Sequence, residues 1–211
     1  MVNMRTLAVI TILATLGFAA DGPYSMGPAG GPPAEVAPAI AQALQKDGVK
    51  ISMGGAAYCE IWFRTEKPSG AKTTEENVTL PSIPVGALVG VIRFDGKGAD
   101  RRGQTIKAGV YTLRYGILPI NGDHQGAAPQ RDFLLLAPAA EDHELNSTPG
   151  FEALVAMSRK ASGTPHPAVL SFWKADSDTP GFAKQGDTDW VLQAKIGDTP
   201  ISVILVGVAS S

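Results

Sequence analysis

Segments in which every second residue is apolar recur along most of the chain, and this alternation constrains the fold more than any other feature. Within residues 109–117, for example, every second residue from position 111 has a large apolar side chain: Tyr111, Leu113, Tyr115 and Ile117. A period of two is typical of a β-strand, because successive side chains point to opposite faces. Further strands are predicted at residues 56–65, 88–94, 133–137, 168–174, 189–196 and 201–208.

Turns are frequent, since the chain has 24 glycines and 16 prolines, and only two short helices are predicted. One covers residues 35–46 and has Pro38 in its first turn. The other begins with Thr148 as cap and Pro149 as first helical residue, and ends at Gly163. We therefore predict a mainly antiparallel β-sandwich or jelly-roll-like domain with one or two short helices over residues 34–211. An open α+β sheet is the alternative.

The N-terminal residues 1–20 have the order of a secretory signal peptide. Arg5 precedes an apolar run at residues 7–18, and small residues before Ala19 and Ala20 predict cleavage after one of these alanines. The run is shorter than the roughly 20 residues of a membrane-spanning helix, although an uncleaved anchor is the alternative. We expect a periplasmic or secreted protein with no transmembrane segment after cleavage, and a flexible Gly/Pro-rich lead-in at residues 21–33.

Charge and cysteine content exclude several classes of function. Loss of Arg5 would take the formal net charge from −2 to −3, whereas a nucleic-acid partner requires a basic face. Cys59 is the only cysteine, so no internal disulfide can form. Its position beside Ile61 and Phe63 favours a buried thiol that packs as a small hydrophobic group. A catalytic thiolate would need a cationic neighbour.

Catalytic and metal-binding motifs are weak. The chain has neither a G-x-x-x-x-G-K-[ST] phosphate loop nor a G-x-S-x-G nucleophile elbow. Its three histidines, His124, His143 and His166, lie far apart in sequence. They lack the short spacing of a metal-binding pair.

The strongest candidate for a functional site is the polar segment at residues 119–132, which joins two predicted strands. Loops that rigid strands hold in place often carry binding residues, and this one is longer than a minimal hairpin loop. The candidate ligand-binding residues are Asn121, Asp123, His124, Gln130, Arg131 and Asp132, with Tyr115 on the preceding strand.

Three interpretations of this segment remain open. His124 could bind a divalent metal or transfer protons, with Asp123 or Asp132 in support. Alternatively Arg131, Asp132, Asn121 and Gln130 could hold an anionic or sugar ligand. A third interpretation is a loop that has only a structural role and is held by its own hydrogen bonds, with Arg131 paired to a carboxylate.

Part of the chain resembles a group of exported bacterial β-domain proteins whose activity is not established. The resemblance rests on Gly109-Val110-Tyr111-Thr112-Leu113-Arg114-Tyr115-Gly116, on Gly122-Asp123-His124, and on Arg131-Asp132-Phe133-Leu134-Leu135-Leu136. It is sharpest over residues 101–142. It implies a periplasmic or secreted β-domain and assigns no catalytic residue.

The sequence thus favours an exported, non-catalytic β-domain that binds a small ligand or a cell-envelope component through residues 119–132. The alternatives are a metal-dependent or hydrolytic enzyme that uses His124 with Asp123 or Asp132, and a structural module of the envelope. No cofactor is predicted, apart from the divalent metal of the enzyme alternative.

Overall fold

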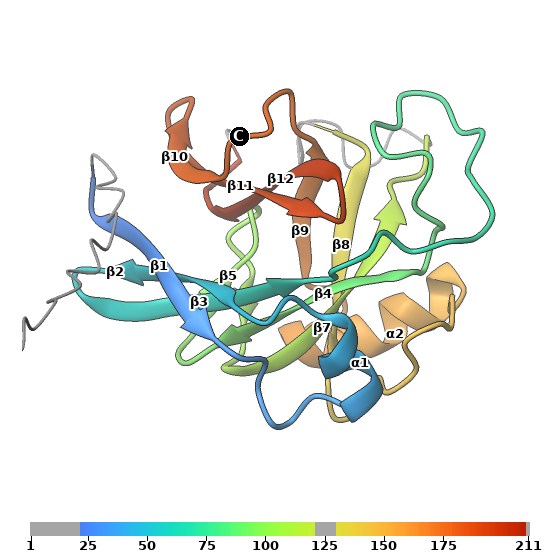
Figure 1. The fold of residues 1–211 in the computed structure, drawn as a ribbon, viewed down its shortest axis with the longest axis horizontal. Coiled ribbons are helices and arrows are strands. Elements are labelled where there is room, and N and C mark those ends of the chain that lie inside the picture. The colour runs from blue at the N-terminus through green and yellow to red at the C-terminus, as the bar shows by residue number, and fades with distance from the viewer. Residues whose placement is uncertain (1–21, 121–129, 210–211) are drawn as a thin grey trace, which may run out of the picture.

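A single ten-stranded antiparallel sheet forms the body of the protein (Figure 1). The computed structural model describes residues 22–120 and 130–209, so the predicted signal peptide lies outside the described residues. From edge to edge the strands are β1 (Tyr24–Gly30), β2 (Gly48–Met53), β3 (Ala56–Phe63), β4 (Leu88–Phe94), β7 (Gly109–Ile117), β8 (Asp132–Pro138), β9 (Val169–Lys174), β12 (Thr199–Val206), β11 (Asp189–Ile196) and β10 (Gly181–Gln185).

The sheet curls until its two edge strands, β1 and β10, approach each other, and β10, β11 and β12 lie opposite β1, β2 and β3 (Figure 1). Aromatic rings fill this seam. The Tyr24 ring centroid lies 5.0 Å from that of Trp190 and 6.1 Å from that of Phe182. The predicted mainly antiparallel β fold with two short helices is confirmed. Its two facing layers are parts of one continuous sheet.

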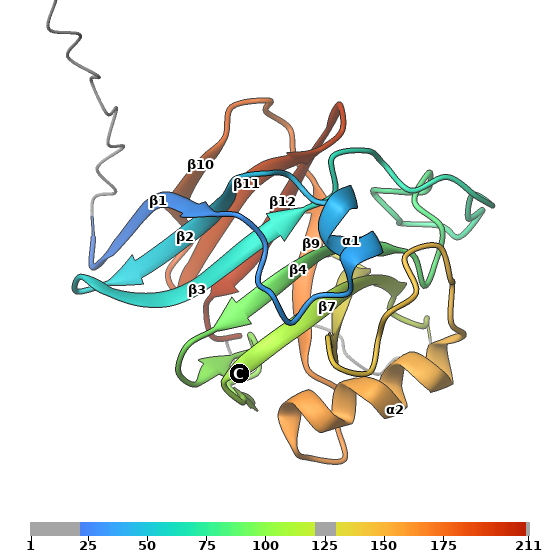
Figure 2. The same cartoon turned by 60° about the horizontal axis from the view of Figure 1, so that its bottom comes forward.

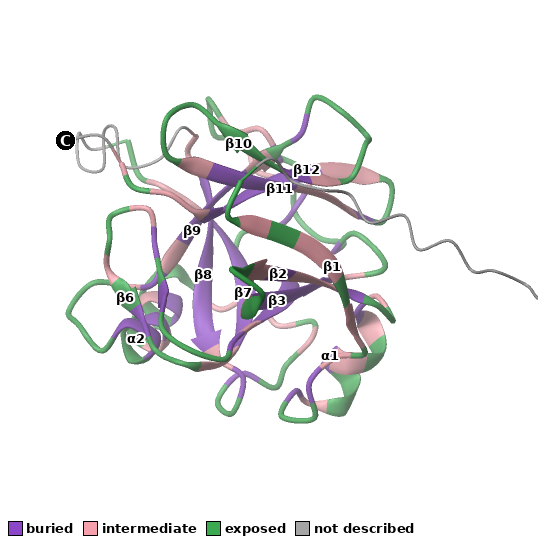
Figure 3. Cartoon of the chain, turned by 90° about the vertical axis from the view of Figure 1, so that its left-hand side faces the viewer, coloured by how far each residue is buried: buried purple, intermediate pink, exposed green. Residues whose placement is uncertain are grey.

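The interior of the curled sheet is the main hydrophobic core, and the strands that line it are buried (Figure 3). Tyr111, Leu113, Tyr115 and Ile117 all face this core, as the alternation predicts. Cys59 is also buried there, and burial raises the pKa of its thiol. The protonated thiol therefore packs as a small hydrophobic group.

Two helices cover parts of the outer face of the sheet (Figure 2). Helix α1 (Pro38–Ala43) packs Ile40 in a cluster with Trp62, Leu88 and Val91. Helix α2 (Phe151–Ser162) packs Leu154 in a cluster with Phe133 and Leu135 of β8, and ends at Gly163 in the left-handed conformation. No helix in the described part of the chain is long and apolar enough to cross a membrane.

Three local expectations differ from the structure. The expected flexible lead-in contains β1, which pairs with β2 through its backbone although its Gly/Pro-rich sequence lacks a strand pattern. Helix α2 begins two residues later than expected, with Gly150 as an N-cap that makes no side-chain hydrogen bond. Helix α1 is shorter than expected, since Pro38–Ala43 occupies only the middle of the predicted range 35–46.

Tyr58 lies beside a bulge between β2 and β3 and packs against the core. Burial there raises the pKa of Tyr58 to about 12.

The smaller hairpin of β5 (Gly98–Ala99) and β6 (Thr105–Ile106) joins β4 to β7. Its turn is held by Asp100, which is buried and accepts hydrogen bonds from the backbone N–H groups of Arg102 and Gln104, each at 3.0 Å. This carboxylate has a local structural role.

Candidate functional site

The residues predicted to bind a ligand divide into two groups. Asn121, Asp123 and His124 lie outside the described residues. Tyr115, Gln130, Arg131 and Asp132 are described, and they form the base of the segment at residues 119–132. Gln130 is partly buried, whereas the other three side chains take part in hydrogen bonds that hold this base together.

Asp132 is fully buried and accepts three hydrogen bonds from other described residues. The Tyr115 hydroxyl donates to Oδ1 at 2.6 Å, and the backbone N–H of Leu80 donates to the same oxygen at 3.0 Å. The backbone N–H of Thr79 donates to Oδ2 at 2.9 Å. Asp132 therefore joins the long connection between β3 and β4 to the start of β8.

The environment of Asp132 also changes the pKa of Tyr115. Burial raises the pKa of its hydroxyl, and the hydrogen bond to Asp132 raises it further. The hydroxyl thus stays protonated and donates to the carboxylate throughout the neutral pH range.

Arg131 closes the two ends of the segment and ties them to a neighbouring loop. Its Nε donates to the carbonyl of Leu118 at 2.9 Å, and the backbone N–H of Leu118 donates back to the Arg131 carbonyl at 2.8 Å. Its terminal nitrogens donate to the Glu76 carbonyl and, at 2.9 Å, to the Glu75 carboxylate. Arg131 therefore pairs with a carboxylate, as the interpretation of a loop with only a structural role expects.

An exposed apolar side chain stands directly beyond this closed base. Ile120 is 70% exposed, the largest exposed fraction among the large hydrophobic side chains of the described residues. Two residues earlier, Leu118 is partly buried against the cluster of Phe133 and Leu135. The chain thus leaves the packed sheet at Leu118 and presents Ile120 to solvent.

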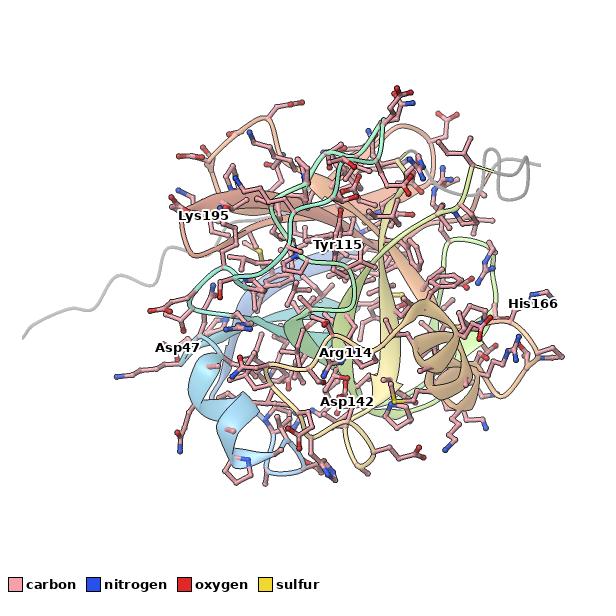
Figure 4. The ribbon with its side chains drawn as sticks, turned by 90° about the vertical axis from the view of Figure 1, so that its right-hand side faces the viewer. Asp47, Arg114, Tyr115, Asp142, His166 and Lys195 are labelled. Atoms are coloured by element: carbon pink, nitrogen blue, oxygen red, sulfur yellow. The ribbon has the colours of Figure 1, made fainter. Side chains whose placement is uncertain are left out.

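Arg114 lies on the opposite face of β7 from Tyr115, and Figure 4 shows it beside Asp142. Its Nε and Nη2 donate to the two oxygens of Asp142, each at 2.6 Å, and the side chain has no exposed surface. The remaining donors reach the carbonyls of Gly86, Ser147 and Glu144 at 2.7–2.8 Å. Every nitrogen of this guanidinium is used to fix the connection between β8 and α2 against the sheet.

A second arginine, which the sequence does not single out, has the opposite environment. Arg64 follows β3 and lines an open groove of about 650 Å³ beside the end of α1. Its Nε is buried and has no hydrogen-bond partner within the described residues. Only its place directly after the buried run Ile61-Trp62-Phe63 marks it in the sequence, as a cation at the end of an apolar strand.

The described residues contain no cluster suited to a metal ion. His143 and His166 are exposed, and no cluster of three or more His, Cys, Asp or Glu side chains suited to a metal occurs in residues 22–120 and 130–209. His124, the residue predicted to bind a metal, is outside these ranges.

Comparison of the chain with protein-family models, curated proteins and solved structures gives no match. The geometry of the described residues therefore carries the functional argument.

Proposed function

We propose that this protein is an exported, non-catalytic β-domain that binds a cell-envelope component through residues 119–132. The observation that carries the proposal is Ile120, which is 70% exposed directly beyond a base fixed by hydrogen bonds. A small ligand is the other occupant expected from the sequence; we prefer a partner surface, because it can bury the Ile120 side chain and gain the free energy of removing it from water. The export signal at residues 1–20 supports a partner outside the cytoplasm.

The fixed base supports a binding role because it lowers the entropy lost on association. Arg131 and Asp132 hold both ends of the segment, through the hydrogen bonds to Leu118, Thr79 and Leu80. A side chain presented from such a base loses less conformational freedom on binding than one on an unsupported chain. Burial of Ile120 by a partner would add the favourable free energy of removing an aliphatic side chain from water.

The polar chemistry near the base supports a structural role for its charged groups. Asp132 and Tyr115 bond to each other, and Arg131 bonds to backbone carbonyls and to Glu75. These groups hold the base of the segment in place, and the exposed Ile120 is the described side chain to which we assign contact with the partner.

Co-sedimentation with washed bacterial envelopes tests the proposal, using the chain without its predicted signal peptide. We expect the wild-type protein to sediment with the envelopes and Ile120→Asp to bind about tenfold more weakly or worse, because central apolar contacts dominate interface energies. The matched control is Met53→Asp, since Met53 is also an exposed large hydrophobic residue, at 49%, and lies at the end of β2.

Equal sedimentation of Ile120→Asp and the wild type would overturn the proposal, as would a wild-type protein that stays in the supernatant. Thermal unfolding of both variants checks that the fold is kept. Because Ile120 is exposed, weaker binding of Ile120→Asp cannot be attributed to a lost core contact.

A further inference from the structure

The groove beside Arg64 lies where the end of α1 meets the end of β3. The backbone N–H of Gln45 donates to the Phe63 carbonyl at 2.9 Å, and that of Thr65 donates to the Ala43 carbonyl at 2.9 Å. These two bonds fix both walls of the groove. In Figure 4, Asp47 and Lys195 lie on the same side of the molecule as α1, and the Gln45 side chain donates to the Lys195 carbonyl at 2.9 Å. The groove is thus a fixed feature of the fold.

Arg64 is held at this position by its own backbone and by the strand pattern. Its N–H donates to the Val89 carbonyl at 2.9 Å, and its backbone forms a β-bridge with Leu44. The side chain consequently follows Trp62 on the outer face of the sheet, where it lines the groove.

The guanidinium of Arg64 has donors that the protein does not use. Its Nε is buried without a partner, and no ion pair or hydrogen bond is formed by its side chain among the described residues. A buried donor without a partner destabilises the folded protein. Burial lowers the pKa of Arg64, and the charge of nearby Glu66 opposes this shift. The terminal nitrogens of Arg64 also make no hydrogen bond among the described residues, and an anion that enters the groove would supply acceptors to them.

The other lining residues define what kind of anion fits. The partly exposed Ala43 gives the groove an apolar wall, and Gln42 and the cationic Lys46 add polar groups at its edge. A volume of about 650 Å³ is that of a site for a small molecule. Glu66 would repel a ligand with several negative charges, whereas a single carboxylate matches the planar fork of a guanidinium.

We propose that this groove binds a small organic carboxylate, with Arg64 on the carboxylate and Ala43 against its apolar body. The site is separate from residues 119–132, so the inference goes beyond the proposed function and does not depend on it. Its occupant differs from an envelope partner in size and in the contacts it needs.

Isothermal titration calorimetry with benzoate tests the proposal, with benzamide as the uncharged probe of the same shape. We expect benzoate to bind the wild-type protein and benzamide to bind at least about tenfold more weakly, because only the carboxylate makes charge-assisted hydrogen bonds. Arg64→Met should weaken benzoate binding by about tenfold or more. Arg64→Lys should give an intermediate affinity, since lysine keeps the charge but lacks the fork.

Arg159→Met is the matched control, because Arg159 is exposed on α2. It should bind benzoate with wild-type affinity, and so should Ile120→Asp, which separates this site from the envelope-binding surface. Unchanged benzoate affinity in a folded Arg64→Met protein would overturn the proposal. Equal binding of benzamide, no binding of benzoate to the wild type, or tighter Arg64-dependent binding of inorganic phosphate would overturn the assignment to organic carboxylates.

Discussion

Arg114 and Arg64 lie on the same face of one sheet, yet their guanidinium groups have opposite environments. Arg114 has no exposed surface and uses all three nitrogens on Asp142 and on the carbonyls around it. Arg64 is partly buried at an open groove and has a buried Nε without a partner among the described residues.

The difference separates structural from functional arginines by a physical criterion. A buried guanidinium whose donors are all used can accept no ligand without breaking existing bonds, so its role is to stabilise the fold. A guanidinium with an unused donor beside open space has an incomplete set of bonds, which a ligand can complete. Charge and the face of the sheet alone do not distinguish the two residues.

The largest effect is expected for Asp142→Ala. This substitution leaves the buried Arg114 charge without its carboxylate, and the free energy of unfolding should fall by about 3–5 kcal/mol in denaturant titrations. Glu141→Ala is the control, because the neighbouring Glu141 pairs with Lys160 at the surface. That change should alter stability by less than about 1 kcal/mol. Similar losses in the two variants would contradict the structural role of Arg114.

An intermediate effect is expected for Tyr115→Phe, which removes the donor to Asp132 from a second fully bonded cluster. The free energy of unfolding at pH 7 should fall by about 1–2 kcal/mol. Tyr58→Phe should cost less, because the Tyr58 hydroxyl reaches the Leu205 carbonyl only at 3.4 Å.

The pH dependence of the same variant gives a second measurement of this cluster. Burial and the bond to Asp132 raise the pKa of Tyr115 above its ordinary value of 10.0. Its contribution to stability is complete below pH 10 and is lost as the pH rises further, because the unfolded chain ionises first. Wild-type stability should therefore fall more steeply than that of Tyr115→Phe above pH 10, by about 1.4 kcal/mol per pH unit. Parallel stability curves above pH 10 would show that Tyr115 ionises as readily in the folded protein.

The smallest effect is expected for Arg64→Met, and its sign is opposite. Removing a buried donor that has no partner should raise the free energy of unfolding by about 1 kcal/mol while benzoate binding is lost. Arg159→Met should change stability by less than about 0.5 kcal/mol. A loss of stability in Arg64→Met would show that the guanidinium is bonded within the protein after all, and would remove the contrast with Arg114.

Much of the fold was predictable because the apolar patterns that indicate strands lie within single short segments. The segments at β4, β7 and β11 were predicted with their observed bounds, since their apolar patterns are complete within each strand. The strands β1 and β10 were not predicted, because they contain few apolar residues and show no clear alternation. They are strands because their backbones pair with β2 and β11.

The candidate sites were less predictable, because a polar side chain in a sequence does not show which of its donors or acceptors are used. The segment at residues 119–132 was recognised by its composition and length. However, Thr79 and Leu80, whose backbone N–H groups bind Asp132, are more than 50 residues away in the chain. Nothing local to Asp132 predicts them.

Period-two alternation, turn residues and a single cysteine are visible along the chain, and they are enough to predict a strand-rich domain without internal disulfides and with one or two short helices. The structural role of Arg114 and the open groove beside Arg64 become apparent only in the folded protein. That distinction depends on partners brought together from distant segments: the loop around Asp142 covers one guanidinium, and the end of α1 leaves the other beside open space.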